Sequence, residues 1–76
     1  MSAVERKDIA VLAAPYRREV RLEEVTYESG MLMFRVIIRE GHRITQIDLD
    51  GETAARWAAI MGDWAARQPA APTGEE

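Results

Sequence analysis

The sequence contains no cysteine, which excludes disulfide bonds and thiolate metal sites. No apolar run approaches the roughly 18 residues that a membrane-spanning helix needs. The N-terminal residues 1–8 also lack the cationic start and long apolar centre of a signal peptide. From these absences we expect a soluble cytoplasmic protein without a membrane partner.

The chain has 76 residues, enough for one small domain. A single core of this size rarely supplies more than about 3–5 kcal/mol, so small domains commonly add a disulfide, a metal or a second subunit. Because cysteine is absent, we expect the supplement to be a second copy of the chain. A homodimer is therefore the predicted oligomeric state.

The sequence also lacks a large excess of either sign of charge. Leaving out Glu75 and Glu76 at the C-terminus, 10 basic residues face 11 acidic ones, which is a net charge of −1. Such a balance gives no long-range attraction to nucleic acid or to an anionic membrane.

The N-terminal segment, residues 1–15, is open to three interpretations. Ser2 and Glu5 have the spacing of a capping box, which favours a short helix. Residues 8–14 equally suit a strand along a sheet edge, and a mobile arm is the third alternative. Pro15 ends either element because it disfavours helical angles at the residue before it.

Residues 16–67 predict one β-β-β-α domain of the α+β class. It is a three-stranded antiparallel meander with a C-terminal amphipathic helix packed on one face. The central strand is Met31–Arg39, the most apolar run of the chain. Gly41-His42 suits a type II′ turn before the third strand. By composition, residues 68–76 are predicted to be a disordered tail.

The first of these strands, residues 17–28, has a break in its alternation. Val20 and Val25 belong to apolar pairs of opposite parity, although a strand alternates strictly. With Ser29-Gly30 as a two-residue turn, one extra residue at Glu23-Glu24 returns both pairs to one face. We therefore predict a β-bulge at Glu23-Glu24.

Asp50 is predicted to cap the helix, because its carboxylate can accept the free backbone amides of the first turn. The helix carries an apolar stripe at three- and four-residue spacing: Ala54, Trp57, Ala58, Met61, Trp64 and Ala65. The sheet face expected to meet it comprises Val20, Leu22, Val25, Tyr27, Leu32, Phe34, Val36, Ile38, Ile47 and Leu49. Trp57, Met61 and Trp64 are expected to cover this face, since aromatic side chains bury large areas.

The second face of the sheet carries an apolar patch among charged residues. The candidate interface consists of Met31, Met33, Arg35, Ile37 and Ile44. One interpretation is a solvated face whose charges pair across strands, including Arg35 with Asp48, Glu24 with Arg35 and Glu19 with Arg39. The other is an interface, because the patch is larger than a small monomer usually exposes and Arg is enriched at interfaces. A twofold-related copy or a helix of residues 3–13 could cover it.

Catalytic chemistry has little support in the sequence. His42 is expected to be an exposed turn residue, without the oriented hydrogen-bonding partner that catalysis would need. A metal site made of His42, Glu40 and Asp48 has no recognisable spacing. Neither serine has a neighbouring base. We therefore predict no catalytic, cofactor-binding or metal-binding residue, and no enzyme.

Nucleic-acid binding is the alternative function. A group of arginines falls at one end of the predicted hairpins: Arg17, Arg18, Arg21, Arg39 and Arg43. Tyr16 lies near them, and proteins that bind single strands combine a basic groove with stacking aromatic residues on a sheet.

Three runs carry a family resemblance: Arg18-Glu-Val-Arg-Leu22, the strand end Ile38-Arg-Glu40, and Ile47-Asp-Leu-Asp-Gly-Glu52 before a Trp-bearing helix. Over residues 19–64 the chain resembles the transcriptional positive cofactor 4 family. The resemblance implies strands followed by a helix in a dimeric protein that binds single-stranded DNA. That family's lysine-rich strand surfaces are replaced here by alternating glutamate and arginine, so no binding residue is carried over.

The chain also resembles small uncharacterised bacterial proteins classed as domains of unknown function, which implies no mechanism. The charge balance favours a non-enzymatic protein-interaction module, acting as a homodimer through the second sheet face. A weak single-stranded nucleic-acid binder is the alternative.

Overall fold

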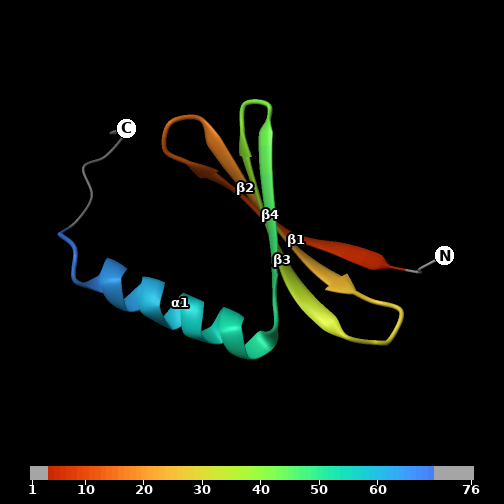
Figure 1. Cartoon of the computed structure of the whole chain (residues 1–76). Coiled ribbons are helices and arrows are strands. Elements are labelled where there is room, and N and C mark those ends of the chain that lie inside the picture. Colours follow the sequence, from red (N-terminus) through yellow and green to blue (C-terminus); the bar gives the residue numbers. More distant parts are fainter. Residues whose placement is uncertain (1–3, 70–76) are drawn as a thin grey trace.

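The computed structural model describes residues 4–69 and shows a four-stranded antiparallel sheet followed by one C-terminal helix (Figure 1). The elements are β1 (Glu5–Ala14), β2 (Arg18–Thr26), β3 (Leu32–Glu40), β4 (Arg43–Leu49) and α1 (Gly51–Ala66). The strands are neighbours in chain order. The α+β class is confirmed, but the predicted three-stranded sheet is wrong because the N-terminal segment adds a strand. The part of the predicted tail beyond residue 69 lies outside the described residues.

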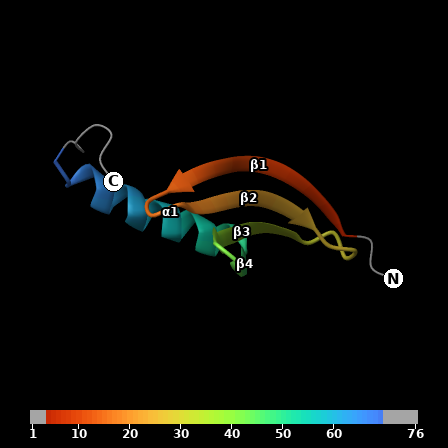
Figure 2. The same ribbon diagram turned by 90° about the horizontal axis from the view of Figure 1, so that it is seen from above.

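The added strand, β1, pairs with β2 along its whole length, so the edge-strand interpretation is the one the structure shows. Its register shifts between Asp8 and Ala10, which leaves Ile9 as a bulge. Figure 2 shows the strands curving, with β1 at the outer edge. Val11 and Leu12 point to opposite faces and are both exposed, as expected of an edge strand. The turn that follows has positive φ at Tyr16 and Arg17.

The predicted bulge at Glu23-Glu24 is wrong, because β2 and β3 pair without a break. Leu22 lies opposite Val36, as predicted. Val25 lies opposite Met33, one residue away from its predicted partner, and therefore points to the second face of the sheet.

The extra residue lies in the β2–β3 turn instead. Residues 28–30 form a three-residue loop, closed by the Tyr27 amide donating to the Met31 carbonyl at 2.9 Å. Gly30 has a φ of 92°, the left-handed conformation that three-residue hairpin loops place at this position. The third residue of the turn thus brings Leu22 opposite Val36, as the predicted bulge would have done. It also places Val25 and Tyr27 on the face of the sheet away from the helix.

The β3–β4 hairpin and the start of the helix are confirmed. Gly41-His42 is a two-residue turn with a positive φ at Gly41, and Phe34 lies opposite Leu49 as predicted. The Asp50 carboxylate accepts the Thr53 amide at 3.0 Å and caps α1.

The buried apolar core of the described chain is small: Val25, Val36 and Leu49. α1 approaches β3 and β4 but not β1 or β2. None of the residues of α1 is buried, and Trp57, Met61 and Trp64 are 40%, 56% and 59% exposed. The prediction that these three side chains cover the sheet is therefore wrong for a single chain. The helix leaves the sheet instead of lying flat on it (Figure 1).

Candidate functional site

The gap between α1 and the sheet is a groove of about 680 Å³. All of its lining residues are apolar, from Leu12, Val20 and Ile38 on the strands to Trp57 and Met61 on the helix. Strand residues of one parity point into it because β2, β3 and β4 pair in register. The groove is thus the unfilled interior of a two-layer arrangement of sheet and helix.

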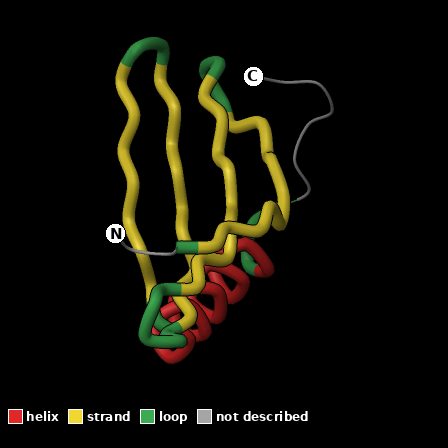
Figure 3. The backbone as a smooth tube through the Cα atoms, turned by 90° about the vertical axis from the view of Figure 1, so that its right-hand side faces the viewer, coloured by secondary structure: helices red, strands yellow, loops and turns green. Residues whose placement is uncertain are grey.

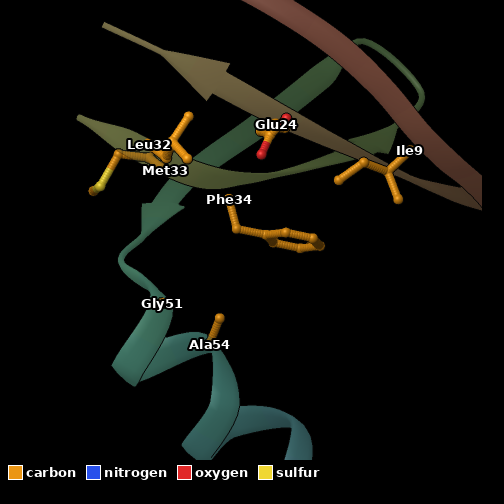
Figure 4. Close-up of a pocket in the computed structure, with 7 residues that line it drawn as sticks. All are labelled: Ile9, Glu24, Leu32, Met33, Phe34, Gly51 and Ala54. Carbon is orange, nitrogen blue, oxygen red and sulfur yellow. The ribbon is translucent and has the colours of Figure 1, made fainter. Parts of the chain in front are cut away.

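A smaller hollow of about 210 Å³ continues the groove toward the start of α1. Figure 4 shows Phe34 pointing from β3 toward Ala54 on the helix, with Ile9 of β1 at the far side. Glu24 is the one charged residue of this lining. The apolar side of the molecule therefore runs from the β1 bulge to the second turn of the helix and beyond.

Four of the five predicted interface residues, Met33, Arg35, Ile37 and Ile44, point to the second face of the sheet, and Met31 lies in the turn just before β3. Met31 and Ile44 are exposed but lie at opposite ends of the sheet, next to the β2–β3 and β3–β4 turns respectively. Met33, Arg35 and Ile37 between them are half-buried. The patch expected from the sequence is therefore interrupted, and its centre is polar.

That centre is a cluster of Tyr27, Arg35 and Asp48. Arg35 Nε donates to Asp48 Oδ1 at 2.8 Å, and an Arg35 terminal nitrogen donates to Asp48 Oδ2 at 3.1 Å and to the Tyr27 hydroxyl at 3.2 Å. The Tyr27 hydroxyl donates to Asp48 Oδ2 at 2.5 Å. The side chains of Arg35 and Asp48 are only 13% and 20% exposed. The predicted Arg35–Asp48 pair is confirmed, whereas Tyr27 was expected on the other face.

The cluster shifts the protonation of all three groups. Hydrogen bonds from Arg35 and then from Tyr27 lower the pKa of Asp48, and the hydrogen bond to Asp48 raises the pKa of Arg35. The hydrogen bond to Asp48 also raises the pKa of Tyr27. At neutral pH the cluster is thus an ion pair with a neutral phenol, which suits a structural link better than proton transfer.

Glu23 lies opposite Arg35 on β2, so the predicted pairing of Arg35 with Glu24 is wrong. Glu23 is buried, and its Oε1 has no hydrogen-bond partner. Arg35 has carboxylates on both neighbouring strands and binds the one on β4.

The five predicted nucleic-acid contacts lie at the end of the sheet that carries the β1–β2 and β3–β4 turns (Figures 1 and 3). By register, Arg18 and Arg43 point to the groove side, Arg21 and Arg39 point to the second face, and Arg17 lies in a turn. The structure therefore brings the group to one end but divides it between two faces.

Acidic residues accompany these arginines. Arg18 forms an ion pair with Glu40, and its guanidinium lies 5.6 Å from the centre of the Tyr16 ring. Glu19 lies opposite Arg39, as predicted. This end of the sheet carries both signs of charge and not a continuous basic groove.

His42 is exposed in the β3–β4 turn. Among residues 4–69, no group of three or more His, Cys, Asp or Glu is placed to hold a metal ion. In the same part of the chain, no helix combines the length and apolar character needed to cross a membrane.

Sequence reasoning missed the groove. The apolar stripe of the helix and the apolar sheet face were both recognised, but they were expected to fill each other. The apolar side of the helix is wider than the predicted stripe, because it also includes Ile60. This width was the signal in the sequence that the sheet alone does not cover the helix.

A family model described as a family of unknown function (DUF6967) matches residues 3–67. No match is found among curated proteins or among solved structures.

Proposed function

The chain belongs to this family of unknown function, and we propose that it is a non-enzymatic protein-interaction module that works as a homodimer. The observation that carries the proposal is a 16-residue helix in which no residue is buried. Isolated helices of this length are marginal in water, and most helical stability in proteins comes from packing an apolar face. α1 therefore needs a surface that its own sheet supplies only in part.

The exposed apolar side chains of α1 support the same proposal. Trp57, Ile60, Met61 and Trp64 are 40%, 66%, 56% and 59% exposed. Contiguous exposed apolar surface of this kind is uncommon on a small monomer and marks protein interaction sites.

The non-enzymatic part of the proposal is supported by the state of the titratable groups. On the second face, the Asp48 carboxylate accepts hydrogen bonds from Arg35 and Tyr27, and these two partners keep it ionised. It lies on a sheet face, whereas the groove, where a small molecule would be enclosed, is lined by apolar side chains alone. An apolar groove without convergent polar groups suits the side chains of another protein.

Light scattering or sedimentation over a dilution series tests the proposal. We expect twice the 8.6 kDa chain mass at micromolar concentration, with dissociation on dilution. A monomer at every concentration up to the solubility limit would show that the proposal is wrong.

A further inference from the structure

We propose that the dimer forms by antiparallel packing of α1 against α1 of the second copy, about a twofold axis near Ile60, and that the paired helices close the two grooves. This inference rests on the proposed function and replaces the second sheet face, which the sequence suggested, with the helix. Three features of α1 support it.

The first feature is an apolar ridge that contributes to the chain's own groove only through Trp57. Trp57, Ile60 and Trp64 follow one another at three- and four-residue spacing, so their side chains are adjacent along one side of the helix. Ile60 and Trp64 are 66% and 59% exposed, and neither lines the groove. A helix that is apolar over so wide an arc is normally covered from more than one direction.

The second feature is the symmetry of this ridge. Trp57 lies three residues before Ile60 and Trp64 lies four residues after it, so an antiparallel copy centred near Ile60 places each Trp beside the other Trp of the partner. Aromatic side chains bury about 150–250 Å² each, and two pairs of them can form the centre of an interface. Isologous packing of this kind is the usual geometry of a closed dimer.

The third feature is charge. Beside the ridge, the charged residues read Glu52, Arg56, Asp63 and Arg67, which alternate in sign along the helix. Reversal about a point next to Ile60 places Arg56 opposite the second copy's Asp63 and Glu52 opposite its Arg67. Within one chain, Arg67 binds only Oδ2 of Asp63, so Oδ1 can accept Arg56 of the second copy. A parallel arrangement would place like charges together.

The position of the helix leaves room for this arrangement. α1 approaches β3 and β4, whereas the part of the groove lined by Leu12 and Val20 lies under β1 and β2. A second helix beside α1 can cover that part. The sheet of each copy then has two helices against its apolar side, which is the usual way a sheet with one apolar face is covered.

Matched glutamate substitutions test the inference. Ile60→Glu places two carboxylates at the proposed axis, and we expect the dissociation constant to rise by roughly 30-fold or more, as for an interface hot spot. Ile44→Glu is the control, since Ile44 is similarly exposed on the second face at 59%. It should leave the dimer unchanged. Circular dichroism of both variants checks that exposed substitutions leave the fold intact.

Charge reversal adds a test that a general loss of folding cannot imitate. Arg56→Asp and Asp63→Arg should each weaken the dimer, and the double variant should regain most of the affinity because the pairs are restored with opposite polarity. Weakening in both single variants without recovery in the double variant would contradict the antiparallel register.

The outcomes separate the two proposals. If Ile44→Glu dissociates the dimer and Ile60→Glu does not, the helix pairing is wrong while the homodimeric module stands with the second face as its interface. If the wild-type chain is monomeric at every concentration, both proposals are wrong. We expect Ile60→Glu to dissociate the dimer and Ile44→Glu to leave it unchanged. We also expect the double variant Arg56→Asp, Asp63→Arg to regain most of the affinity that each single variant loses.

Discussion

Asp48→Asn should destabilise the fold through the polar cluster on the second face. The substitution keeps the shape of the side chain but removes its charge and replaces one acceptor oxygen with an NH2 group. That group would face either Arg35 or Tyr27, both of which donate to Asp48. Arg35 is left with a largely buried guanidinium and one hydrogen bond to the side chain at position 48 instead of two.

The magnitude follows from the burial of the pair. Breaking a fully buried ion pair costs about 3–5 kcal/mol, and losing one hydrogen bond to a charged group costs about 1.5–3 kcal/mol. Arg35 and Asp48 are not fully buried, and Glu23 on the other neighbouring strand offers Arg35 a second carboxylate. We therefore expect a loss of about 2 kcal/mol, which lowers the Tm of a domain of this size by roughly 8–16 °C.

Urea denaturation followed by circular dichroism measures this loss, with wild type and variant at one protein concentration because a dimer's stability depends on it. Glu40→Gln is the matched control: it breaks the ion pair with Arg18, which is far more exposed. Exposed pairs contribute about 0–1 kcal/mol, so the control should change little. Equal losses in the two variants would refute the reasoning, because burial of the Arg35–Asp48 pair would then have no effect.

Other perturbations test the pH response, the turns and the core. The pKa of Asp48 is lowered in the folded chain, so its contribution to stability is complete above about pH 4 and is lost as the pH falls through the lowered pKa; this acid loss should shrink in Asp48→Asn. Gly30→Ala, at φ 92°, should cost about 1–2 kcal/mol in urea denaturation, whereas Gly62→Ala, whose added Cβ meets no atom within 4 Å, should gain roughly 0.5–1 kcal/mol. The opposite signs would contradict the assigned backbone conformations. Val25→Ala should cost about 2–3 kcal/mol because Val25 is fully buried, and a loss no larger than that of exposed Val11→Ala would place Val25 outside the core.

The parts of the fold that follow from short-range signals were predictable. Gly41 supplies the positive φ of a two-residue turn, and Asp50 supplies the acceptor that starts the helix. Both signals lie within three residues of the structure they determine, so no knowledge of the rest of the chain is needed. The pairing of β3 with β4, including Arg35 with Asp48, follows from that turn.

The β2–β3 register was not predictable in the same way. A bulge at Glu23-Glu24 and a third residue in the turn both bring Leu22 opposite Val36, so the pattern of the outer residues fits either. They differ in the faces given to residues 24–27, which include Val25 and Tyr27. Since each has an apolar side chain that either face can bury, alternation does not decide between them.

What covers the apolar side of the helix, which forms part of the candidate site, was unpredictable for a different reason. Periodicity shows that one side of residues 51–66 is apolar and must be covered, but it does not say by what. The sheet of the same chain and the helix of a second chain present equally apolar surfaces to Trp57 and Trp64. Only the placement of the helix in space, with its ridge exposed, favours the second.

The three-residue loop at Glu28–Gly30 has a consequence for how this chain can change during evolution. Removing or adding one residue there would turn β1 and β2 over relative to β3, β4 and the helix, exchanging the side chains of Val20 and Leu22 with those of Arg21 and Glu23. The side chain of Glu28 is exposed, whereas the exposed Ser29 hydroxyl accepts the Met31 amide at 3.3 Å. Substitutions at Glu28 should therefore accumulate freely, while insertions and deletions between Tyr27 and Met31 are eliminated.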